Sequence, residues 1–348
     1  MATYEEIIQT VRPKEIVEFC RNLLRVPSVN PPGDVSRCAR LLRDLLLGES
    51  IEVAEIPCGA GRVNVVARLG KRGCGERLVL LNGHLDTVPV GPGWTRDPFG
   101  AELAGGRIFG RGSSDMKAGL AAMAFAVISL KRSAVPLNGS VVFTAVADEE
   151  TGSWNGTRYL MEHYLDAKPD MAVVGEPTSL LLYHGNRGVV WADITVTGQA
   201  CHAGRPHLGA NAITQAARLI SRLACMQFDL RNECFEVPVP SLTTTMVCGG
   251  TSRNVVPNSC TFSVDRRLLP GESADEAVRQ IERVADEVLK GSGVSFQLSV
   301  VSEWDPYFIE PGHPVVGLVR RVAEEVTGRP VELKCKSSAT DASHIYAK

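Results

Sequence analysis

Three adjacent acidic residues, Asp148, Glu149 and Glu150, directly follow an apolar run at residues 140–147. Their carboxylates repel one another, so placing them at the end of a buried strand is unfavourable unless a cation compensates the charge. Carboxylate oxygens bind divalent metal ions well, and an acid beside such an ion can serve as a catalytic base. The triplet therefore predicts a catalytic metal site, if other ligands converge on it.

Two further apolar runs end in residue types that bind metals. Residues 77–81 lead into His84 and Asp86, and residues 171–174 lead into Glu176. Near-continuous apolar runs of this length are typical of parallel strands that helices cover on both faces. In such sheets, ligands bind just beyond the carboxyl ends of the strands. We therefore expect these side chains to lie along one rim of the sheet.

Asp115 joins the same rim from a glycine-containing turn that precedes an Ala-rich helix predicted at residues 116–131. Each feature has a simpler explanation when it is taken alone. His84 is compatible with a strand-end histidine whose hydrogen bonds are satisfied, and Glu150 with an acid favoured by a helix dipole. The recurrence of the pattern at four element ends favours a metal. The residues expected on this rim are His84, Asp115, Glu149, Glu150 and Glu176.

Composition excludes several classes of protein. The chain has 348 residues, 44% of them hydrophobic, and its 37 basic and 39 acidic side chains give a net charge of −2. No overall field favours nucleic acid or an anionic membrane, so neither is an expected partner. The start of the chain lacks the features of a secretory signal, and the longest apolar run, residues 119–130, is too short to span a bilayer. We expect a cytoplasmic protein whose ten cysteines are reduced thiols.

The rhythm of the chain predicts an α/β fold with a mostly parallel sheet and an inserted α+β domain. Residues 184–300 read as strand, helix, strand, strand, helix, strand, which is the split ferredoxin-like order. An α/β pattern returns afterwards, with a helix at 314–327 and a strand at 331–334. Residues 1–183 and 301–348 are therefore assigned to a metal-binding catalytic domain, and residues 184–300 to an insertion. Pairing of exposed sheet edges in the insertion predicts a homodimer.

Taken together, these motifs resemble the M20 family of dinuclear metallohydrolases. That family includes acetylornithine deacetylases, succinyl-diaminopimelate desuccinylases, aminoacylases and glutamate carboxypeptidases. The similar segments are residues 83–89, 110–117, 148–152 and 175–178, followed in the insertion by residues 201–212, 254–257 and 265–271.

The resemblance implies a role for each candidate residue of the catalytic domain. Asp115 would bridge two metal ions. One of these ions would also be bound by His84 and Glu176, and the other by Glu150. Asp86 would orient His84, and Glu149 would be the general base. An imidazole and carboxylate set suits zinc, with cobalt or manganese as alternatives. Zinc lowers the pKa of bound water to about 7–9, so two ions can hold a hydroxide and polarise an amide carbonyl. Glu149 then passes the proton of the water to the departing amine.

In the insertion, the resemblance implies that His202 reaches the active site of the partner subunit and stabilises the developing oxyanion. Arg267 and Asn254 are candidates to bind a substrate carboxylate. The simpler alternatives are that His202 is only a solvated loop histidine and that Arg267 pairs with Asp265.

The chain departs from the family pattern after residues 339–345, because the family places a final histidine ligand beyond this stretch and the chain stops at Lys348. His344 falls too early to replace it. The expectation is a truncated chain or a natural remnant, with one tight and one weak metal site and reduced turnover.

The leading interpretation is a metal-dependent amidohydrolase that acts on N-acyl amino acids, of the deacetylase or desuccinylase type. A dipeptidase or carboxypeptidase of the same family is the alternative enzyme, because the same chemistry cleaves a peptide amide. A protein that binds metal or small ligands without hydrolysis is the alternative from another class. Glu149 disfavours it, because a pure binder does not need an additional acid beside the ligands.

Overall fold

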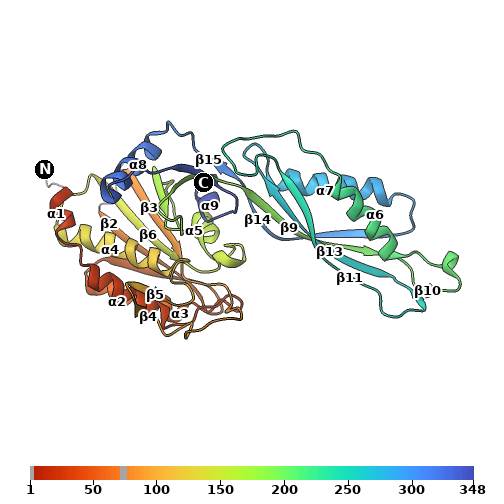
Figure 1. Ribbon diagram of the computed structural model, residues 1–348, viewed down its shortest axis with the longest axis horizontal. Helices are drawn as coiled ribbons and strands as arrows, with labels where there is room; N and C mark the ends of the chain where they lie inside the picture. Colours follow the sequence, from red (N-terminus) through yellow and green to blue (C-terminus); the bar gives the residue numbers. More distant parts are fainter. Residues whose placement is uncertain (1–3, 71–76) are drawn as a thin grey trace. The chain divides into compact units, whose positions relative to one another are not determined.

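The computed structural model describes residues 4–70 and 77–348, and their contacts divide the chain into two compact units (Figure 1). Unit 1 consists of two segments, the chain up to Leu180 and His344–Lys348, and unit 2 is Leu181–Ser343. This division places residues 301–343 in unit 2, whereas the sequence pattern predicts them in the catalytic domain. The limits of the functional domains stay a prediction.

Unit 1 is built on a five-stranded sheet with the order β1-β2-β6-β3-β7. The strands are β1 (Glu52–Gly59), β2 (Arg62–Gly70), β3 (Arg77–His84), β6 (Gly139–Val146) and β7 (Met171–Val174). Strands β6, β3 and β7 run parallel, and the β1–β2 hairpin extends the sheet in the antiparallel sense. The α/β class is confirmed, and the three strands expected to carry the site are the parallel ones.

Helices cover both faces of this sheet, which explains its continuous apolar runs. On one face, α2 (Pro13–Leu24), α3 (Ser36–Gly48) and α4 (Lys117–Ser133) pack against Phe143 and Ala145. On the other face, Val142 and Val146 pack in a second cluster with Leu160 of α5 (Thr157–His163). Alternate residues of β6 thus point to opposite cores, as the pleat of a strand requires. The remaining elements of unit 1 are α1 (Tyr4–Ile8), β4 (Glu102–Ala104), β5 (Arg107–Phe109), the 3₁₀ turn η1 (Glu149–Thr151) and most of α9 (Ala342–Ala347).

Unit 2 contains the expected ferredoxin-like order. The elements are β9 (Gly188–Thr197), α6 (Ala212–Ala224), β11 (Ser241–Gly249), β13 (Ser259–Leu268), α7 (Ala274–Leu289) and β14 (Ser295–Trp304). Their antiparallel sheet has the order β11-β13-β9-β14. The apolar sides of α6 and α7 pack on one face of this sheet, so each amphipathic helix buries its stripe in a single core. The inserted α+β fold is therefore confirmed.

A smaller three-stranded sheet completes unit 2. It has the order β15-β8-β16, from Tyr307–Phe308, Leu182–Asn186 and Leu333–Lys336. Helix α8 (Pro314–Thr327) matches the expected helix, and His313 caps it by accepting a hydrogen bond from the N–H of Val315. The last elements are β10 (Cys201–His202), β12 (Val255–Val256) and the turn η2 (Pro206–Leu208). In the part of the chain that the structure describes, no helix has both the length and the hydrophobicity needed to cross a bilayer.

Candidate metal centre

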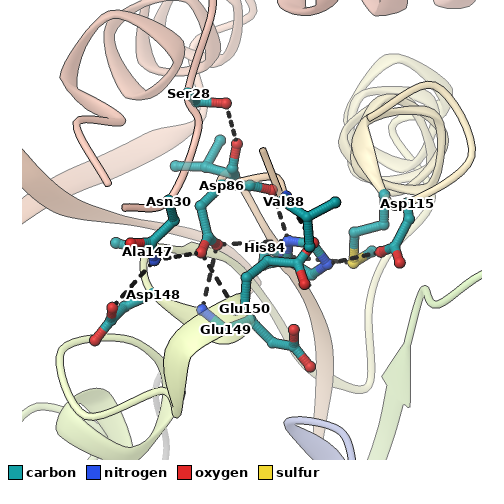
Figure 2. A network of polar contacts seen from close by, with 12 residues as sticks. Ser28, Asn30, His84, Asp86, Val88, Asp115, Ala147, Asp148, Glu149 and Glu150 are labelled. Carbon is teal, nitrogen blue, oxygen red and sulfur yellow. Dashed lines mark hydrogen bonds and ion pairs between the residues drawn. The ribbon is translucent and has the colours of Figure 1, made fainter. Parts of the chain in front are cut away.

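The predicted ligands lie at the carboxyl ends of the parallel strands of unit 1. His84 is the last residue of β3 and pairs in register with Val146, the last residue of β6. The acidic turn follows β6 directly, and Glu176 follows the end of β7. Asp115 stands just ahead of α4 and faces the imidazole of His84 (Figure 2). Parallel strands bring their carboxyl ends to one edge of a sheet, and this explains how segments far apart in sequence meet here.

The side chains come close enough to share a cation. His84 Nε2 lies 3.0 Å from Asp115 Oδ1 and 3.8 Å from Glu176 Oε1. Two sets of side chains place one ligand atom each within 4.8 Å of one another, and His84 belongs to both. The first set adds Glu149 and Glu176 to His84, and the second adds Asp115 and Glu150. The structure thus brings together an imidazole and four carboxylates.

The pKa values of His84 and Glu150 shift in the direction expected where carboxylates are in excess. Burial by itself would lower the pKa of His84, but hydrogen bonds to Asp115 and Asp86 and the charge of Glu149 raise that pKa well above its ordinary value. Burial raises the pKa of Glu150 to about 7, and the carboxylates of Asp115 and Asp86 contribute in the same direction, against the lowering effect of His84. The protein thus favours protons where the carboxylates crowd. A divalent cation would supply the same compensation, so the donor set fits the metal ions that the resemblance implies.

The hydrogen bonds of His84 leave one ring nitrogen directed at the carboxylates. Its Nδ1 lies 2.9 Å from the backbone carbonyl of Asp86, to which an Nδ1–H donates, and 3.5 Å from the carboxylate oxygen Oδ1. This partner favours the tautomer whose Nε2 lone pair is available to a metal. Asp86 thus contacts His84 more closely through its main chain than through its carboxylate.

The carboxylate of Asp86, which is fully buried, holds the acidic turn instead. Its two oxygens accept hydrogen bonds from the backbone N–H groups of Glu149 and Glu150, each at 3.2 Å. One of them also accepts from Asn30 Nδ2 at 2.8 Å (Figure 2). Asp86 therefore fixes the backbone from which both glutamates project.

Asp148, the first acid of the triplet, belongs to neither ligand set. It adopts a left-handed backbone conformation with φ 74° and is 4% exposed. Its carboxylate accepts hydrogen bonds from Thr151, from Asn30 Nδ2 at 3.2 Å, and from the backbone and side-chain nitrogens of Asn155 at 3.2 and 2.8 Å. Burial opposes ionisation, but these hydrogen bonds prevail and lower the pKa of Asp148. Asp148 stabilises the turn, and only the second and third acids face the cluster.

Two residues near the centre make contacts to which the motifs assign no role. Asn30 joins Asp86 to Asp148, and Lys117 is 1% exposed, with its ammonium group donating to the carbonyls of Leu23 and Val26 at 3.0 and 2.8 Å. The available signals were an Asn-Pro-Pro-Gly turn at residues 30–33 and a lysine at the start of an otherwise apolar helix. Neither signal specifies a partner so distant in sequence.

The candidate residues of the insertion lie in unit 2. His202 is in β10, opposite Val255 of β12, and its exposed ring accepts a hydrogen bond from the N–H of Gly204 at 3.0 Å. Asn254 stands beside it, because its carbonyl accepts from the N–H of Ala203 at 2.9 Å and its side chain accepts from Ser252. The structure therefore brings His202 and Asn254 together on one small ribbon.

Arg267 is on β13 and makes a bidentate ion pair with Asp265. Its Nε and Nη2 lie 2.6 and 2.7 Å from the two carboxylate oxygens. Trp191 Nε1 donates to the same carboxylate at 2.9 Å. The pairing with Asp265 that the sequence left open is thus present.

Comparisons with known proteins agree with this geometry. Residues 80–348 match the model of peptidase family M20/M25/M40. A succinyl-diaminopimelate desuccinylase from Cereibacter sphaeroides strain ATCC 17025 is 33% identical over 344 residues, covering 96% of this chain and 89% of that protein. One from Gluconobacter oxydans strain 621H is 31% identical over 343 residues, with 96% and 87% covered.

Solved structures show the same fold. The M20 family metallo-carboxypeptidase Sso-CP2 from Sulfolobus solfataricus has a TM-score of 0.80 at 20% identity, over 95% of this chain and 88% of that one. The aminopeptidase PepT from Bacillus cereus ATCC 10987 has a TM-score of 0.75 at 22% identity, over 97% and 88%. At these identities the likeness concerns the fold alone.

Proposed function

We propose, because the chain belongs to peptidase family M20/M25/M40, that it hydrolyses the amide bond of N-acyl amino acids. The family and its relatives make it a hydrolase that acts on amide bonds. The observation that supports hydrolysis is the cluster of His84 with four carboxylates at one rim of the sheet. The narrower substrate class, a desuccinylase or deacetylase substrate, is supported by relatives named succinyl-diaminopimelate desuccinylase that match nearly the whole chain.

The family implies divalent metal ions, and the residues that would hold them are His84, Asp115, Glu150 and Glu176. We propose two ions, of zinc or of cobalt or manganese, because carboxylate and imidazole donors suit all three metals. When bound, such ions activate a water molecule and polarise the carbonyl of the amide.

Glu149 is the residue we propose as general base. Its carboxylate can take a proton from the attacking water and deliver it to the nitrogen of the leaving amine, which would otherwise depart as a very poor leaving group. Its place next to Glu150 supports this assignment, because the hydrogen bonds from both backbone N–H groups to Asp86 fix the turn that carries them. A fixed base works at the correct distance without rearrangement.

Unit 2 is proposed to contribute to substrate binding. His202 would donate to the oxygen on which negative charge develops, in the active site of a partner subunit, and Asn254 and Arg267 would bind a substrate carboxylate. A homodimer is proposed because the strands at the two edges of the unit 2 sheet, β11 and β14, expose apolar side chains such as Met246, Val247 and Val301. Light scattering on the purified protein measures the mass, and a strictly monomeric species would remove the dimer and the role of His202 with it.

The deciding experiment is hydrolysis of a substrate panel with zinc or cobalt added. The panel contains N-succinyl-diaminopimelate, N-acetylornithine, other N-acyl amino acids and dipeptides. Cleavage of the dipeptides alone would favour the peptidase alternative. Glu149→Ala is expected to keep its metal and lose turnover by several orders of magnitude, because the proton transfer is lost. Glu162→Ala, which removes an exposed glutamate of α5, is the control and should behave as wild type. Normal turnover by Glu149→Ala would exclude Glu149 as the base.

A further inference from the structure

Residues 23–30 contribute none of the predicted ligands, yet they are hydrogen-bonded to the segments that carry them. Lys117, two residues after Asp115, donates to the carbonyls of Leu23 and Val26. Ser28 Oγ donates to the carbonyl of Leu85 at 2.7 Å, directly after His84. Residues 23–28 therefore already contact the segment that carries Asp115 and the segment that carries His84, and Asn30 adds further contacts.

The main chain around Asn30 is fixed against the segment that follows β3. The N–H of Asn30 donates to the carbonyl of Thr87 at 2.8 Å, and the N–H of Thr87 donates to the carbonyl of Ser28 at 3.0 Å. These reciprocal bonds form a short bridge between Val29 and Thr87. The side chain of Asn30 consequently starts from a backbone position that is set relative to His84.

The side-chain amide of Asn30 joins both halves of the centre. Its Nδ2 lies 2.8 Å from Asp86 Oδ2, 3.2 Å from Asp148 Oδ1 and 3.0 Å from Thr151 Oγ1, and the side chain is 2% exposed. Two N–H groups thus serve three acceptors, two of which are carboxylates whose charges repel each other. Asn30 separates these carboxylates and holds them at one distance.

The position of Asn30 affects His84 and the two glutamates through one further residue, Asp86. Asp86 accepts the backbone N–H groups of Glu149 and Glu150, and its main-chain carbonyl accepts from His84. Any movement of Asp86 relative to the acidic turn therefore changes the separation of His84 from both glutamates. The bond from Asn30 to Asp148 at the start of that turn restrains the same movement from the other side.

We propose that Asn30 is a positioning residue, which sets the spacing between His84 and the Glu149–Glu150 turn and thereby the affinity of the centre for divalent ions. For its effect on turnover this inference rests on the proposed function. Hydrogen-bonded residues behind metal ligands are typically worth about 10–100-fold in metal affinity or activity.

The test compares Asn30→Ala with Asn155→Ala in the full chain. Asn155→Ala is a matched control, because it removes one side-chain amide bond to Asp148, at 2.8 Å, without touching Asp86. The first readout is cobalt(II) affinity, measured in competition with a chelator. The second is urea unfolding of the metal-free proteins, and the third is kcat and KM on the best substrate of the panel. Asn30→Ser, which keeps one donor, replaces Asn30→Ala if the alanine variant does not fold.

Asn30→Ala is expected to bind cobalt(II) about 10–100-fold more weakly and to lose kcat with KM little changed, whereas Asn155→Ala stays within about threefold of wild type in both. Wild-type cobalt affinity in Asn30→Ala would overturn the inference, and so would an equal loss in both variants at equal unfolding midpoints. If the wild type binds cobalt but cleaves no amide, the proposed function fails, and the cobalt comparison still decides the role of Asn30. A wild type that binds no cobalt overturns both.

Discussion

Replacing Gly119 with alanine tests how closely α4 must approach the end of β7. A Cβ added at Gly119 would lie 2.3 Å from the carbonyl oxygen of Gly175, which is main chain and has no side-chain freedom to move aside. Gly175 directly precedes Glu176, and its N–H donates to the carbonyl of Asn82 at 3.0 Å. The close approach therefore lies between the helix that follows Asp115 and the turn that carries Glu176.

The expected displacement follows from ordinary contact distances. A Cβ and a carbonyl oxygen rest at 3.4 Å or more, so helix and turn must separate by about 1 Å. Overpacking of this kind costs about 1–3 kcal/mol of unfolding free energy, against about 1 kcal/mol gained because alanine has a better helix propensity than glycine. A 1 Å misplacement in a catalytic arrangement can lower turnover by about 100-fold. The net loss of unfolding free energy should be about 0–2 kcal/mol, while metal affinity and turnover fall strongly.

Gly317→Ala in α8 is the matched control. It makes the same chemical change inside a helix, and nothing lies within 4 Å of the added Cβ. This variant should be more stable than wild type by about 0.5–1 kcal/mol. Urea unfolding of the metal-free proteins gives the free energies, and chelator competition gives the metal affinity of each variant.

The two alanine variants should therefore differ by about 1–3 kcal/mol in unfolding free energy, with the metal defect confined to Gly119→Ala. If Gly119→Ala gains the same stability as Gly317→Ala and binds metal as the wild type does, the close contact between α4 and the Glu176 turn does not constrain the centre.

Two further predictions concern buried basic side chains. Lys117→Met should lower the unfolding free energy by about 2–5 kcal/mol in urea, because the buried carbonyls of Leu23 and Val26 lose their donor; a change below 1 kcal/mol would show that water replaces the ammonium group. Burial, with a smaller contribution from Arg158, lowers the pKa of His344 to about 4, below the value of about 6.5 in the unfolded chain. As the pH falls, His344 therefore takes up its proton in the unfolded chain before it does so in the folded protein. The stability that the folded protein has relative to the unfolded chain is complete in this respect above about pH 6.5, and up to about 3 kcal/mol of it is lost as the pH falls towards 4. His344→Gln should flatten this part of the stability profile in urea titrations at each pH, and an unchanged slope would contradict the assignment.

Much of the centre was predictable from sequence because its ligands follow strongly patterned strands. Continuous apolar runs at residues 77–81, 140–147 and 171–174 indicated buried strands, and the structure has β3, β6 and β7 there. The common direction of parallel strands then places the residues after each strand at one edge of the sheet. His84 and the glutamates that follow the other two runs lie close together at this edge. Strand direction alone is enough to predict this, without knowledge of individual contacts.

Other features could not be predicted because no periodic pattern in the sequence encodes them. The β1–β2 hairpin runs antiparallel beside the parallel strands, although β2 is as apolar as its neighbours, since apolar content does not encode strand direction. The apolar run before the acidic triplet does not by itself distinguish Asp148 from the acids that follow it. Its left-handed backbone and its hydrogen-bond donors turn it away from the cluster.

The residues of the chain by themselves determined which segments become strands and helices and which chemical groups stand at their ends, because hydrophobic periodicity and turn chemistry are local. Only the tertiary structure decided what holds those groups in place. Asn30 is 56 residues from Asp86 and 118 from Asp148, and Lys117 is 94 residues from Leu23. A hydrogen bond between partners so distant depends on the packing of the whole unit, and no local pattern records it.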